Sequence, residues 1–401
     1  MKAKLIPVLL LLTTPAVAEN DFDAYKNQQQ QMANQYATNT QQDFEQYKKA
    51  LHAGFEDLQQ TYLKESKRYR QRVIRQWGDF KESDKTTWVN YSANGRVRES
   101  VNFSTGAVEV EFLAYKTDSA AKLKQQAQQN IVELLSTNEQ QAFANDVVAQ
   151  KVETKIKQHS DVVKTGKPSV NNLVMAPLVA KIDLNNKPAV NQLAGKLMAT
   201  ATTETKPIDA KQQIVKVRFK IPAKLSAKAS RFATRVQQIA KKEKIPVALV
   251  YAVIETESNF NPLAKSHIPA YGLMQIVPVS AGKDASKYLF GKAKVLAPSY
   301  LYNSDNNIAV GGAYLHILYY NYLRKIEDST SRLFCAIAAY NTGTGNVAKS
   351  FVGSYNINKA IKKINKMSAS EVYRHLRKHL PHDETKHYIK RVATRMAKYQ
   401  V

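Results

Sequence analysis

The sequence predicts an α+β fold in which a mixed region of helix and antiparallel sheet precedes an all-α region. Apolar residues recur at helical spacing from residue 44 to 77, and they alternate with polar residues from 86 to 115. Beyond residue 222 the apolar patterns have helical spacing again. The chain of 401 residues exceeds the length of one average domain. We therefore expect two domains, residues 19–222 and residues 223–401, after a leader segment.

The first 18 residues have the pattern of a secretory signal peptide. Lys2 and Lys4 give a positive start, residues 5–12 form a short apolar run, and Ala16-Val17-Ala18 is a small-residue cleavage pattern. The apolar run is too short to cross a bilayer. No cysteine follows it, so we expect an exported, periplasmic protein that has no lipid anchor and associates with the outer membrane only peripherally.

The expected N-terminal domain begins with helix and continues with sheet. Residues 20–42 are rich in Gln and Asn and favour no particular structure. The apolar stripe that starts at Phe44 predicts an amphipathic helix reaching Trp77. Between residues 86 and 115, alternation of period two with two glycine-containing turns predicts a three-stranded antiparallel meander.

The rest of this domain is predicted as two helices, a loop region and one strand. Helical patterns cover residues 119–135 and 139–159, and prolines then mark a loop region up to residue 188. From residue 214 to 221, apolar residues alternate with Lys216, Arg218 and Lys220, which predicts a strand with one basic face. That face is either solvated or binds an anionic glycan, and the pattern leaves both alternatives open.

Charge is the unusual feature of the composition. The chain has 59 Lys and Arg against 33 Asp and Glu, a formal net charge of +26, which favours polyanionic surroundings. The basic residues are scattered and no nucleic-acid-binding motif is present, so we expect no nucleic-acid partner. Peptidoglycan carboxylates and anionic lipid headgroups fit an exported protein better. We therefore expect peripheral association with an anionic wall or membrane surface.

We expect no cofactor and no metal. His375, His379 and His382 have a spacing that could hold a metal on a helix, but Pro381 interrupts it, and we favour a solvated basic helix. Cys335 is the only cysteine and lies in an apolar helical pattern. It is predicted to be a buried small hydrophobic residue and not a nucleophile.

The most informative segment of the second domain is an apolar helix that ends in carboxylates. Residues 246–254 are apolar on every face and begin with proline, which predicts a buried helix. Glu257 would lie in its last turn, where burial and the helix dipole both raise a carboxyl pKa, as a general acid requires. Glu255 is the competing candidate, but it points roughly 200° away around the helix axis. We favour Glu257 because it precedes the loop.

A second apolar helix is predicted to end opposite the first. Residues 331–340 form its apolar pattern, and Asn341 follows them, with Gly343 suited to a left-handed cap. Because two buried helices then end in polar residues, we expect a cleft between these ends. Glu257, Ser258, Tyr340 and Asn341 would line it.

Four motifs in this half resemble those of a known family. They are Glu257-Ser258-Asn259-Phe260-Asn261-Pro262, Gly272-Leu273-Met274-Gln275-Ile276, Ala339-Tyr340-Asn341-Thr342-Gly343, and Tyr388. In this order they resemble the motifs of lytic murein transglycosylases of the goose-lysozyme-like type. Trp88-Val89-Asn90-Tyr91 and residues 100–106 resemble the accessory domain of the membrane-bound lytic transglycosylase C group. The resemblance implies a lysozyme-like fold for residues 223–401.

The resemblance also implies a reaction. Most glycosidases use two carboxylates, whereas the motif segments supply only Glu257. In the family, one glutamic acid protonates the bond between N-acetylmuramic acid and N-acetylglucosamine in peptidoglycan, and its carboxylate then deprotonates the sugar's own 6-hydroxyl, which leaves a 1,6-anhydromuramyl end. Two alternatives remain at this point: a hydrolytic muramidase and a non-catalytic peptidoglycan-binding scaffold.

The neighbouring motif residues are predicted to bind the glycan strand. Ser258 would bond the carboxyl, Met274 and Gln275 would form the floor, and Tyr340 with Asn341 would bind the acetamido group or position the carboxyl. Tyr388 would approach from the far wall. Met274 and Tyr388 have an alternative interpretation as core residues. Cell-wall proteins are expected as partners of the N-terminal domain.

Overall fold

The computed structural model describes residues 15–179, 182–222, 224–267 and 269–399. Residues 1–14 of the predicted signal peptide lie outside the described residues. The chain divides into two compact units, residues 1–52 and residues 53–401. Among the described residues, no helix combines the length and apolar character needed to cross a membrane.

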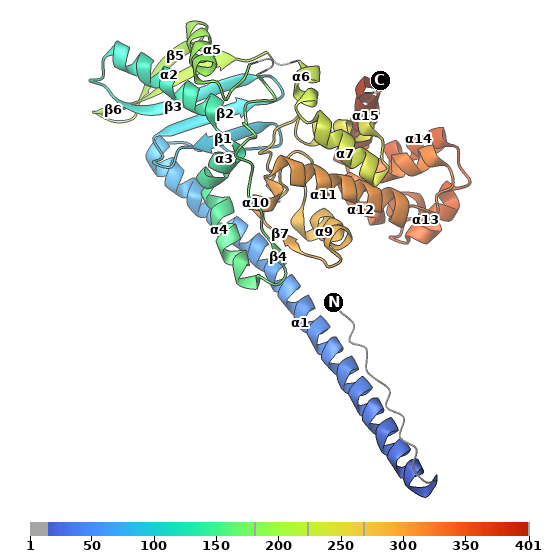
Figure 1. Cartoon of the computed structure of the whole chain (residues 1–401). Coiled ribbons are helices and arrows are strands. Elements are labelled where there is room, and N and C mark those ends of the chain that lie inside the picture. Colours follow the sequence, from blue (N-terminus) through green and yellow to red (C-terminus); the bar gives the residue numbers. More distant parts are fainter. Residues whose placement is uncertain (1–14, 180–181, 223, 268, 400–401) are drawn as a thin grey trace. The chain divides into compact units, whose positions relative to one another are not determined.

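The described part of the first unit is helical. Helix α1 (Pro15–Trp77) begins in this unit and ends in the second (Figure 1). The stretch 20–42, whose composition favoured no structure, is therefore helix. Gln and Asn have middling helix propensities, so their abundance does not prevent a helix. The predicted end of the helix at Trp77 is confirmed.

The second unit contains a five-stranded sheet in which every neighbouring pair is antiparallel. The predicted meander and the strand predicted over residues 214–221 are confirmed, whereas the fully exposed edge strand β5 was not predicted. In spatial order the strands are β1 (Thr87–Tyr91), β2 (Val97–Asn102), β3 (Ala107–Tyr115), β6 (Gln212–Lys220) and β5 (Thr202–Pro207).

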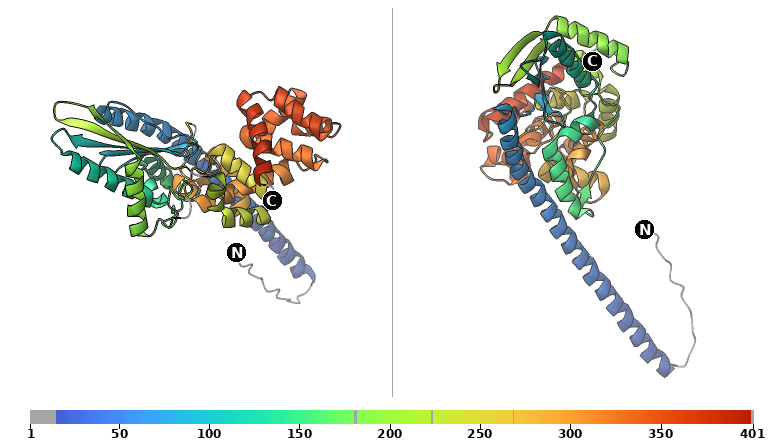
Figure 2. Two further views of the ribbon diagram at one scale, coloured as in Figure 1. Left: turned by 90° about the horizontal axis from the view of Figure 1, so that it is seen from above. Right: turned by 90° about the vertical axis from the view of Figure 1, so that its left-hand side faces the viewer.

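The two faces of this sheet are covered differently. Val110 and Phe112 of β3 are fully buried in the apolar core that includes residues of α2 (Ala120–Ser136). Leu113, which points the other way, packs with Trp77 at the end of α1. Figure 2 shows α2 and the end of α1 on opposite faces of the strands. Burying each large apolar side chain stabilises the fold by about 1.5–3 kcal/mol.

Among the described residues, three α-helices and one short 3-10 helix complete the N-terminal half. The predicted helix over 139–159 is broken at Asp146, which ends α3 and caps α4 by accepting a hydrogen bond from the Ala149 N–H. The loop predicted up to residue 188 ends earlier than expected, because Asn186 caps α5 and Pro188 occupies its first turn. The bounds are α3 (Glu139–Asn145), α4 (Val147–Ile156), η1 (Lys157–His159) and α5 (Lys187–Ala199).

The region after residue 223 is helical, as predicted, apart from the two-residue strand β7 (Val295–Leu296), which pairs in parallel with β4 (Val163–Lys164). Its first helices are α6 (Leu225–Ser230), α7 (Ala233–Glu243), α8 (Val247–Glu257), η2 (Pro278–Gly282), α9 (Lys283–Phe290), α10 (Pro298–Leu301) and α11 (Ser304–His316). Next come η3 (Ile317–Tyr322), α12 (Ser329–Val352), α13 (Ile357–Ile364), α14 (Ala369–His379), α15 (Asp383–Met396) and η4 (Ala397–Tyr399).

Two features of these helices position the site. Helix α8 is buried along almost its whole length and packs against α7 and α15, so the C-terminal helix lies beside the end of α8. Helix α12 changes direction at Gly343, whose φ of 82° and ψ of 155° are outside the helical region. The sequence predicted that this helix ends at residues 341–343, whereas a further helical segment continues from Gly343 to Val352.

One apolar cluster contains residues from both sides of the domain boundary predicted at residue 222. Val110 and Val217 of the sheet belong to the same cluster as Val250 of α8. The division into residues 19–222 and 223–401 stays a prediction.

Candidate active site

Glu257 is the last residue of α8 and is only 4% exposed. Its position at the end of a buried apolar helix is the one predicted. The two residues that follow Ser258 have left-handed backbone conformations, with φ of 52° at Asn259 and 66° at Phe260. Such conformations cost about 1–3 kcal/mol each for residues other than glycine. Burial of the Phe260 ring, stacked 6.1 Å from Phe232, helps to maintain this turn.

The charge nearest to Glu257 comes from the N-terminal half of the chain. The Lys85 ammonium lies 3.5 Å from Oε2 of Glu257 and 3.4 Å from Oε1 of Glu384. Burial raises the pKa of Glu257, and the Lys85 cation offsets part of this rise. The carboxyl therefore favours its protonated form more than an exposed glutamate does.

Tyr388 of α15 faces the same carboxyl. Its side chain is 1% exposed, and its hydroxyl makes no hydrogen bond of standard geometry to any of the described residues. Burial, followed by the negative charge of Glu257, raises the pKa of Tyr388 well above its ordinary value. Tyr388 is thus buried, as a core residue would be, and its polar end is directed towards Glu257, as expected for a residue on the far wall of the site.

Glu255 has different surroundings, although it lies only two residues earlier on α8. Its carboxylate is 3.0 Å from Arg395 and from Lys398, and it accepts a hydrogen bond of 2.9 Å from the Tyr399 hydroxyl. All three partners belong to the last turns of the described chain. Glu255 therefore ties α8 to the C-terminal helix, as the opposite direction of its side chain suggested.

The turn at residues 272–276 is shaped by Asn307 of α11, a residue that the sequence analysis missed. Gly272 has a φ of 74°, and a Cβ at this position would lie 2.3 Å from the Asn307 amide nitrogen. Asn307 donates hydrogen bonds to the carbonyls of Tyr271 and Leu301 and accepts one from the Met274 N–H. Only glycine leaves room for the Asn307 amide beside residue 272, so the glycine of this motif is explained by the structure of the turn.

Met274 and Gln275 have different roles in this turn. The Met274 side chain is fully buried against Gly311, where an added Cβ would lie 2.3 Å from its sulfur. Gln275 has a left-handed φ of 47°, and its amide nitrogen donates to the Gly272 carbonyl at 3.1 Å. Its side-chain oxygen is buried and has no hydrogen-bond partner among the described residues.

The remaining predicted residues connect the elements around the site. The Tyr340 hydroxyl donates to the Met274 carbonyl at 2.8 Å, and Asn341 accepts a 2.6 Å hydrogen bond from Thr385 of α15. The Ser258 hydroxyl donates to the Ile254 carbonyl at 3.0 Å, the acceptor one turn earlier in α8. The predicted bond from Ser258 to the Glu257 carboxyl is therefore replaced by a bond to the backbone.

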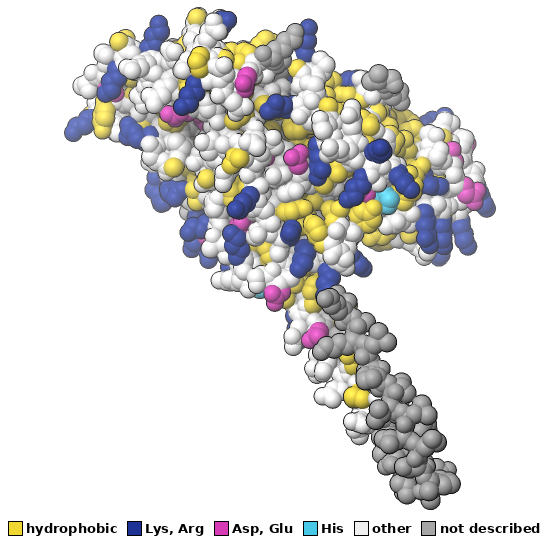
Figure 3. All heavy atoms as spheres, viewed as in Figure 1, with side chains coloured by type: hydrophobic (Ala, Val, Ile, Leu, Met, Phe, Trp, Pro, Cys, Tyr) yellow, Lys and Arg dark blue, Asp and Glu magenta, His cyan; other side chains and the backbone are white. Residues whose placement is uncertain are grey.

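The basic face predicted on β6 is largely paired with carboxylates. Lys216 lies 3.3 Å from Glu111, and Arg218 lies 2.7 Å from both Glu109 and Glu204. These contacts argue against a free cationic surface for a glycan on this strand. Figure 3 shows Lys and Arg side chains spread over the visible face of the molecule.

His375, the first of the histidines considered for a metal, is engaged in other contacts. The His375 ring stacks 4.3 Å from Phe351, and its Nε2 lies 2.8 Å from the Ser350 carbonyl oxygen. Within the described ranges, no group of three potential metal-binding side chains is present. Cys335 is a buried free thiol, and burial raises its pKa.

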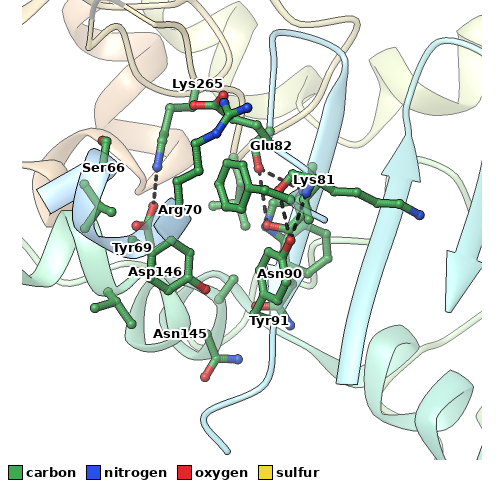
Figure 4. Close-up of a pocket in the computed structure, with 18 of the residues that line it drawn as sticks. Ser66, Tyr69, Arg70, Lys81, Glu82, Asn90, Tyr91, Asn145, Asp146 and Lys265 are labelled. Carbon is green, nitrogen blue, oxygen red and sulfur yellow. Dashed lines mark hydrogen bonds and ion pairs between the residues drawn. The ribbon is translucent and has the colours of Figure 1, made fainter. Parts of the chain in front are cut away.

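A cavity of about 270 Å³ is lined mainly by residues of the N-terminal half of the chain (Figure 4). It is bordered by the end of α1, β1, the α3–α4 junction, and Leu263 and Lys265 from the loop after Glu257. Lys265 forms an ion pair of 3.2 Å with Asp146 across it. Glu257 itself does not line this cavity.

Lys85 and Glu384, like Asn307, were not predicted from the sequence as residues of the site. No local pattern marks Lys85, which lies far in sequence from the four motifs of the C-terminal half. Glu384 could have been found, because it precedes Tyr388 by four residues and therefore shares its face of α15.

Comparisons with known proteins agree with the resemblance seen in the sequence. The family model of the Transglycosylase SLT domain matches residues 235–364. The membrane-bound lytic murein transglycosylase C of Yersinia enterocolitica is 31% identical over 318 residues, which cover 78% of this chain and 82% of that protein. The protein of the same name from Serratia proteamaculans is 31% identical over 321 residues, with the same coverage.

A solved structure is also similar in part. The 70 kDa soluble lytic transglycosylase of Escherichia coli is 23% identical in sequence and aligns with a TM-score of 0.34. The alignment covers 44% of this chain and 25% of that one.

Proposed function

The chain belongs to the membrane-bound lytic murein transglycosylase C family, and from this premise we propose that it cleaves peptidoglycan strands with formation of 1,6-anhydromuramyl ends. As a family member it is a peptidoglycan lytic transglycosylase. Glu257 is the residue that carries the proposed reaction. The observation that carries it is the burial of this carboxyl at the end of α8, where the protonated form is favoured.

In the first step Glu257 acts as general acid. Its proton passes to the oxygen between N-acetylmuramic acid and N-acetylglucosamine, the bond from C1 to that oxygen breaks, and its electron pair stays on the leaving oxygen. A raised carboxyl pKa keeps the proton available near neutral pH. The acetamido group of the muramyl sugar would stabilise the oxocarbenium-like intermediate.

In the second step the carboxylate of Glu257 acts as base. It takes the proton of the muramyl 6-hydroxyl while that oxygen bonds to C1, and this returns Glu257 to its acid form. No water is consumed. The Lys85 ammonium, 3.5 Å from Oε2, is the cation closest to the carboxylate that exists between the two steps.

The neighbouring residues are assigned roles according to their free polar groups. The Gln275 side-chain oxygen and the Tyr388 hydroxyl lack hydrogen-bond partners among the described residues, so we assign them to sugar binding. Tyr340 and Met274 shape the wall, because the Tyr340 hydroxyl is bonded to the Met274 carbonyl. Ser258 and Asn341 line the site with polar groups already engaged by the protein.

A product analysis tests this proposal. Purified sacculi are digested with the full chain, and the muropeptides are analysed by mass spectrometry with and without borohydride reduction. Anhydro products are lighter than hydrolysis products by the mass of one water, and they resist reduction. Anhydromuramyl ends as the main species would support the proposal, and reducible muramic acid ends would reject it.

Hydrolysis is the second candidate, because the structure provides a second carboxylate. Glu384 shares the Lys85 ammonium with Glu257, so its carboxylate lies close enough to activate a water in a two-carboxylate mechanism. Its side chain is 64% exposed and lacks the desolvation of Glu257. Glu384→Gln should abolish activity in a hydrolase and leave most of it in a transglycosylase.

Localisation and partners complete the proposal. Residues 1–18 would direct export to the periplasm and be removed, and the excess of basic residues would hold the protein peripherally on an anionic wall or membrane surface. Residues 19–222 would form the accessory domain, with cell-wall proteins as potential partners. N-terminal sequencing of the mature protein tests the cleavage before Glu19.

A further inference from the structure

A lysine outside the lysozyme-like motifs reaches the proposed acid. Lys85 lies in the segment 78–86, which connects α1 to β1 and is called here the α1–β1 segment. Its ammonium lies between two carboxylates, 3.5 Å from Glu257 and 3.4 Å from Glu384. The Lys85 side chain is 39% exposed, whereas that of Glu257 is 6% exposed.

The backbone around Lys85 is held by hydrogen bonds of its own. The Asp84 carboxylate accepts from the N–H groups of Thr86 and Thr87 at 2.6 and 2.7 Å, and the Asp84 N–H donates to the Thr87 carbonyl at 2.8 Å. These bonds form a compact turn of the Asx type. The turn therefore sets the position of the Lys85 Cα atom, from which the side chain extends.

Asn261 of the motif that begins with Glu257, and Lys265 in the loop that follows it, are bonded to the same turn. The Asn261 amide nitrogen lies 3.5 Å from the Lys85 carbonyl oxygen, and the Lys265 N–H donates to the Asp84 carbonyl at 3.3 Å. Asn261 is fully buried and belongs to the motif that begins with Glu257. The loop after the acid and the turn that carries Lys85 are therefore directly joined.

The beginning of the α1–β1 segment is anchored as well. The Tyr91 hydroxyl accepts from the Lys81 N–H and donates to the Lys81 carbonyl, at 3.0 and 3.1 Å (Figure 4). The Ser83 hydroxyl accepts from the Val89 N–H at 2.8 Å. None of these bonds uses the side chain of Lys85, so its replacement should leave the segment in place.

We propose that Lys85 is a positioning residue for Glu257, supplied by the N-terminal half, which orients the carboxyl and balances the charge that proton donation leaves on it. This inference rests on the proposed role of Glu257. The ammonium already lies 3.5 Å from Oε2 of Glu257 before the charge forms on the carboxyl. Glu384 competes for the same ammonium and limits its effect on Glu257.

The proton balance of the reaction is unchanged by Lys85. Glu257 gives its proton to the leaving oxygen and recovers one from the muramyl 6-hydroxyl, while the ammonium keeps its three protons throughout. The cation acts twice: it makes Glu257 a stronger acid, and it stabilises the carboxylate until the second step.

The test is a pair of variants that move the pH profile in opposite directions. Among the described residues, the groups that face Glu257 are Lys85, Glu384 and Tyr388 together with Tyr340 of α12. In Lys85→Met the alkaline limb of kcat should move to higher pH by about one unit, because the carboxyl loses its cation. On the acidic plateau kcat should fall about tenfold with KM nearly unchanged. In Glu384→Gln the limb should move to lower pH, by roughly half a unit.

Two controls separate this role from a general structural one. Lys85→Arg keeps the charge and should retain the wild-type profile within about 0.3 units. Lys398→Met removes a lysine that pairs with Glu255, which lies on α8 as Glu257 does. The pH profile of kcat should not move in this variant. The melting temperature of every variant is measured to confirm folding.

The outcome that overturns the inference is distinct from failure of the proposed function. If Glu257→Gln is active, Glu257 is not the acid and the proposed function fails. If Glu257→Gln is inactive but Lys85→Met or Glu384→Gln has the wild-type pH profile, the role of Lys85 alone is rejected. Should Lys85→Met not fold, the Glu384→Gln profile still decides the question.

Discussion

Glu111 in the sheet and Glu257 at the end of α8 are both nearly inaccessible to solvent, but their surroundings contain different amounts of positive charge. Glu111 lies within 2.6 Å of Arg98, 2.7 Å of Lys81 and 3.3 Å of Lys216. Glu257 has one lysine at 3.5 Å, shared with Glu384. Burial alone would raise the pKa of Glu111, but the hydrogen bonds from Arg98 and Lys81 lower it to about 2.

This difference separates a structural carboxylate from a reactive one. Three close cations keep Glu111 ionised, and removing the charge would leave Arg98 buried beside it. Glu257 lies where burial outweighs its single shared cation, and its pKa is raised. A carboxyl that must give up and regain a proton needs the second environment.

The largest expected effect comes from removing the acid at the cleft. Glu257→Gln should keep the fold and reduce sacculus cleavage by roughly three orders of magnitude, since one residue serves as acid and then as base. Glu255→Gln is the matched variant on the same helix and should retain most of the activity. Initial rates of muropeptide release measure both. Loss of activity in Glu255→Gln with retention in Glu257→Gln would reverse the assignment.

Removing the carboxylate of the sheet should change stability and leave the chemistry intact. Glu111→Gln leaves the Arg98 guanidinium buried with one remaining carboxylate, Asp79, so the free energy of unfolding should fall by about 3 kcal/mol. Activity per folded molecule should stay at the wild-type level. Glu204→Gln, which removes an exposed partner of Arg218, is the control and should cost less than about 1 kcal/mol. An equal loss of unfolding free energy in the two variants would mean that the burial of the ion pairs around Glu111 does not contribute to stability.

A third carboxyl shows how burial without a cation affects stability. Burial raises the pKa of Glu139 to about 7, although the Ser304 hydroxyl donates to it. Because the folded pKa lies above the unfolded value of 4.5, this group's contribution is complete below about pH 4.5 and is lost as the pH rises through 7. In Glu139→Gln the fall in unfolding free energy between pH 5 and 8 should shrink by on the order of 2 kcal/mol.

Urea denaturation at both pH values measures this effect. The exposed Glu327→Gln serves as the control and should reproduce the wild-type pH dependence. A wild-type slope in Glu139→Gln would show that Glu139 titrates normally despite its burial.

The smallest effect concerns the hydroxyl that faces Glu257. Tyr388→Phe removes a buried polar group without a hydrogen-bond partner among the described residues, so the stability should stay the same or rise by up to about 1 kcal/mol. Activity should fall about tenfold if the hydroxyl binds the sugar. Tyr251→Phe on α8 is the control, and its activity should not change. A large loss of stability in Tyr388→Phe would instead make this residue part of the core only.

The sequence predicted the features that depend on local patterns. The apolar run before Glu257 predicted that this residue is buried, and helix geometry predicted that Glu255 points in another direction. Both predictions depend only on residues that are neighbours along one helix. The sequence could not predict the cations that set each carboxyl's environment. Lys85 and the Arg395 partner of Glu255 come from distant segments, and only the packed fold brings them there.

Two features differ from the sequence prediction, each for its own reason. Lys216 and Arg218 formed a basic face in the sequence, but the register of β6 with β3 places Glu109 and Glu111 opposite them. Helix α5 was not predicted, because its Asn186 cap and Pro188 continue the loop-like pattern of the residues before them.

A carboxyl titration tests the contrast between the two glutamates most directly. The full chain is labelled with 13C at glutamate side-chain carboxyls, and Glu257→Gln and Glu111→Gln identify the two signals by NMR. As the pH falls, Glu257 should take up its proton above the ordinary value of 4.5, and Glu111 should stay ionised until about pH 2. A Glu257 signal that titrates at or below 4.5 would contradict the proposal that the cleft keeps this carboxyl ready to act as an acid.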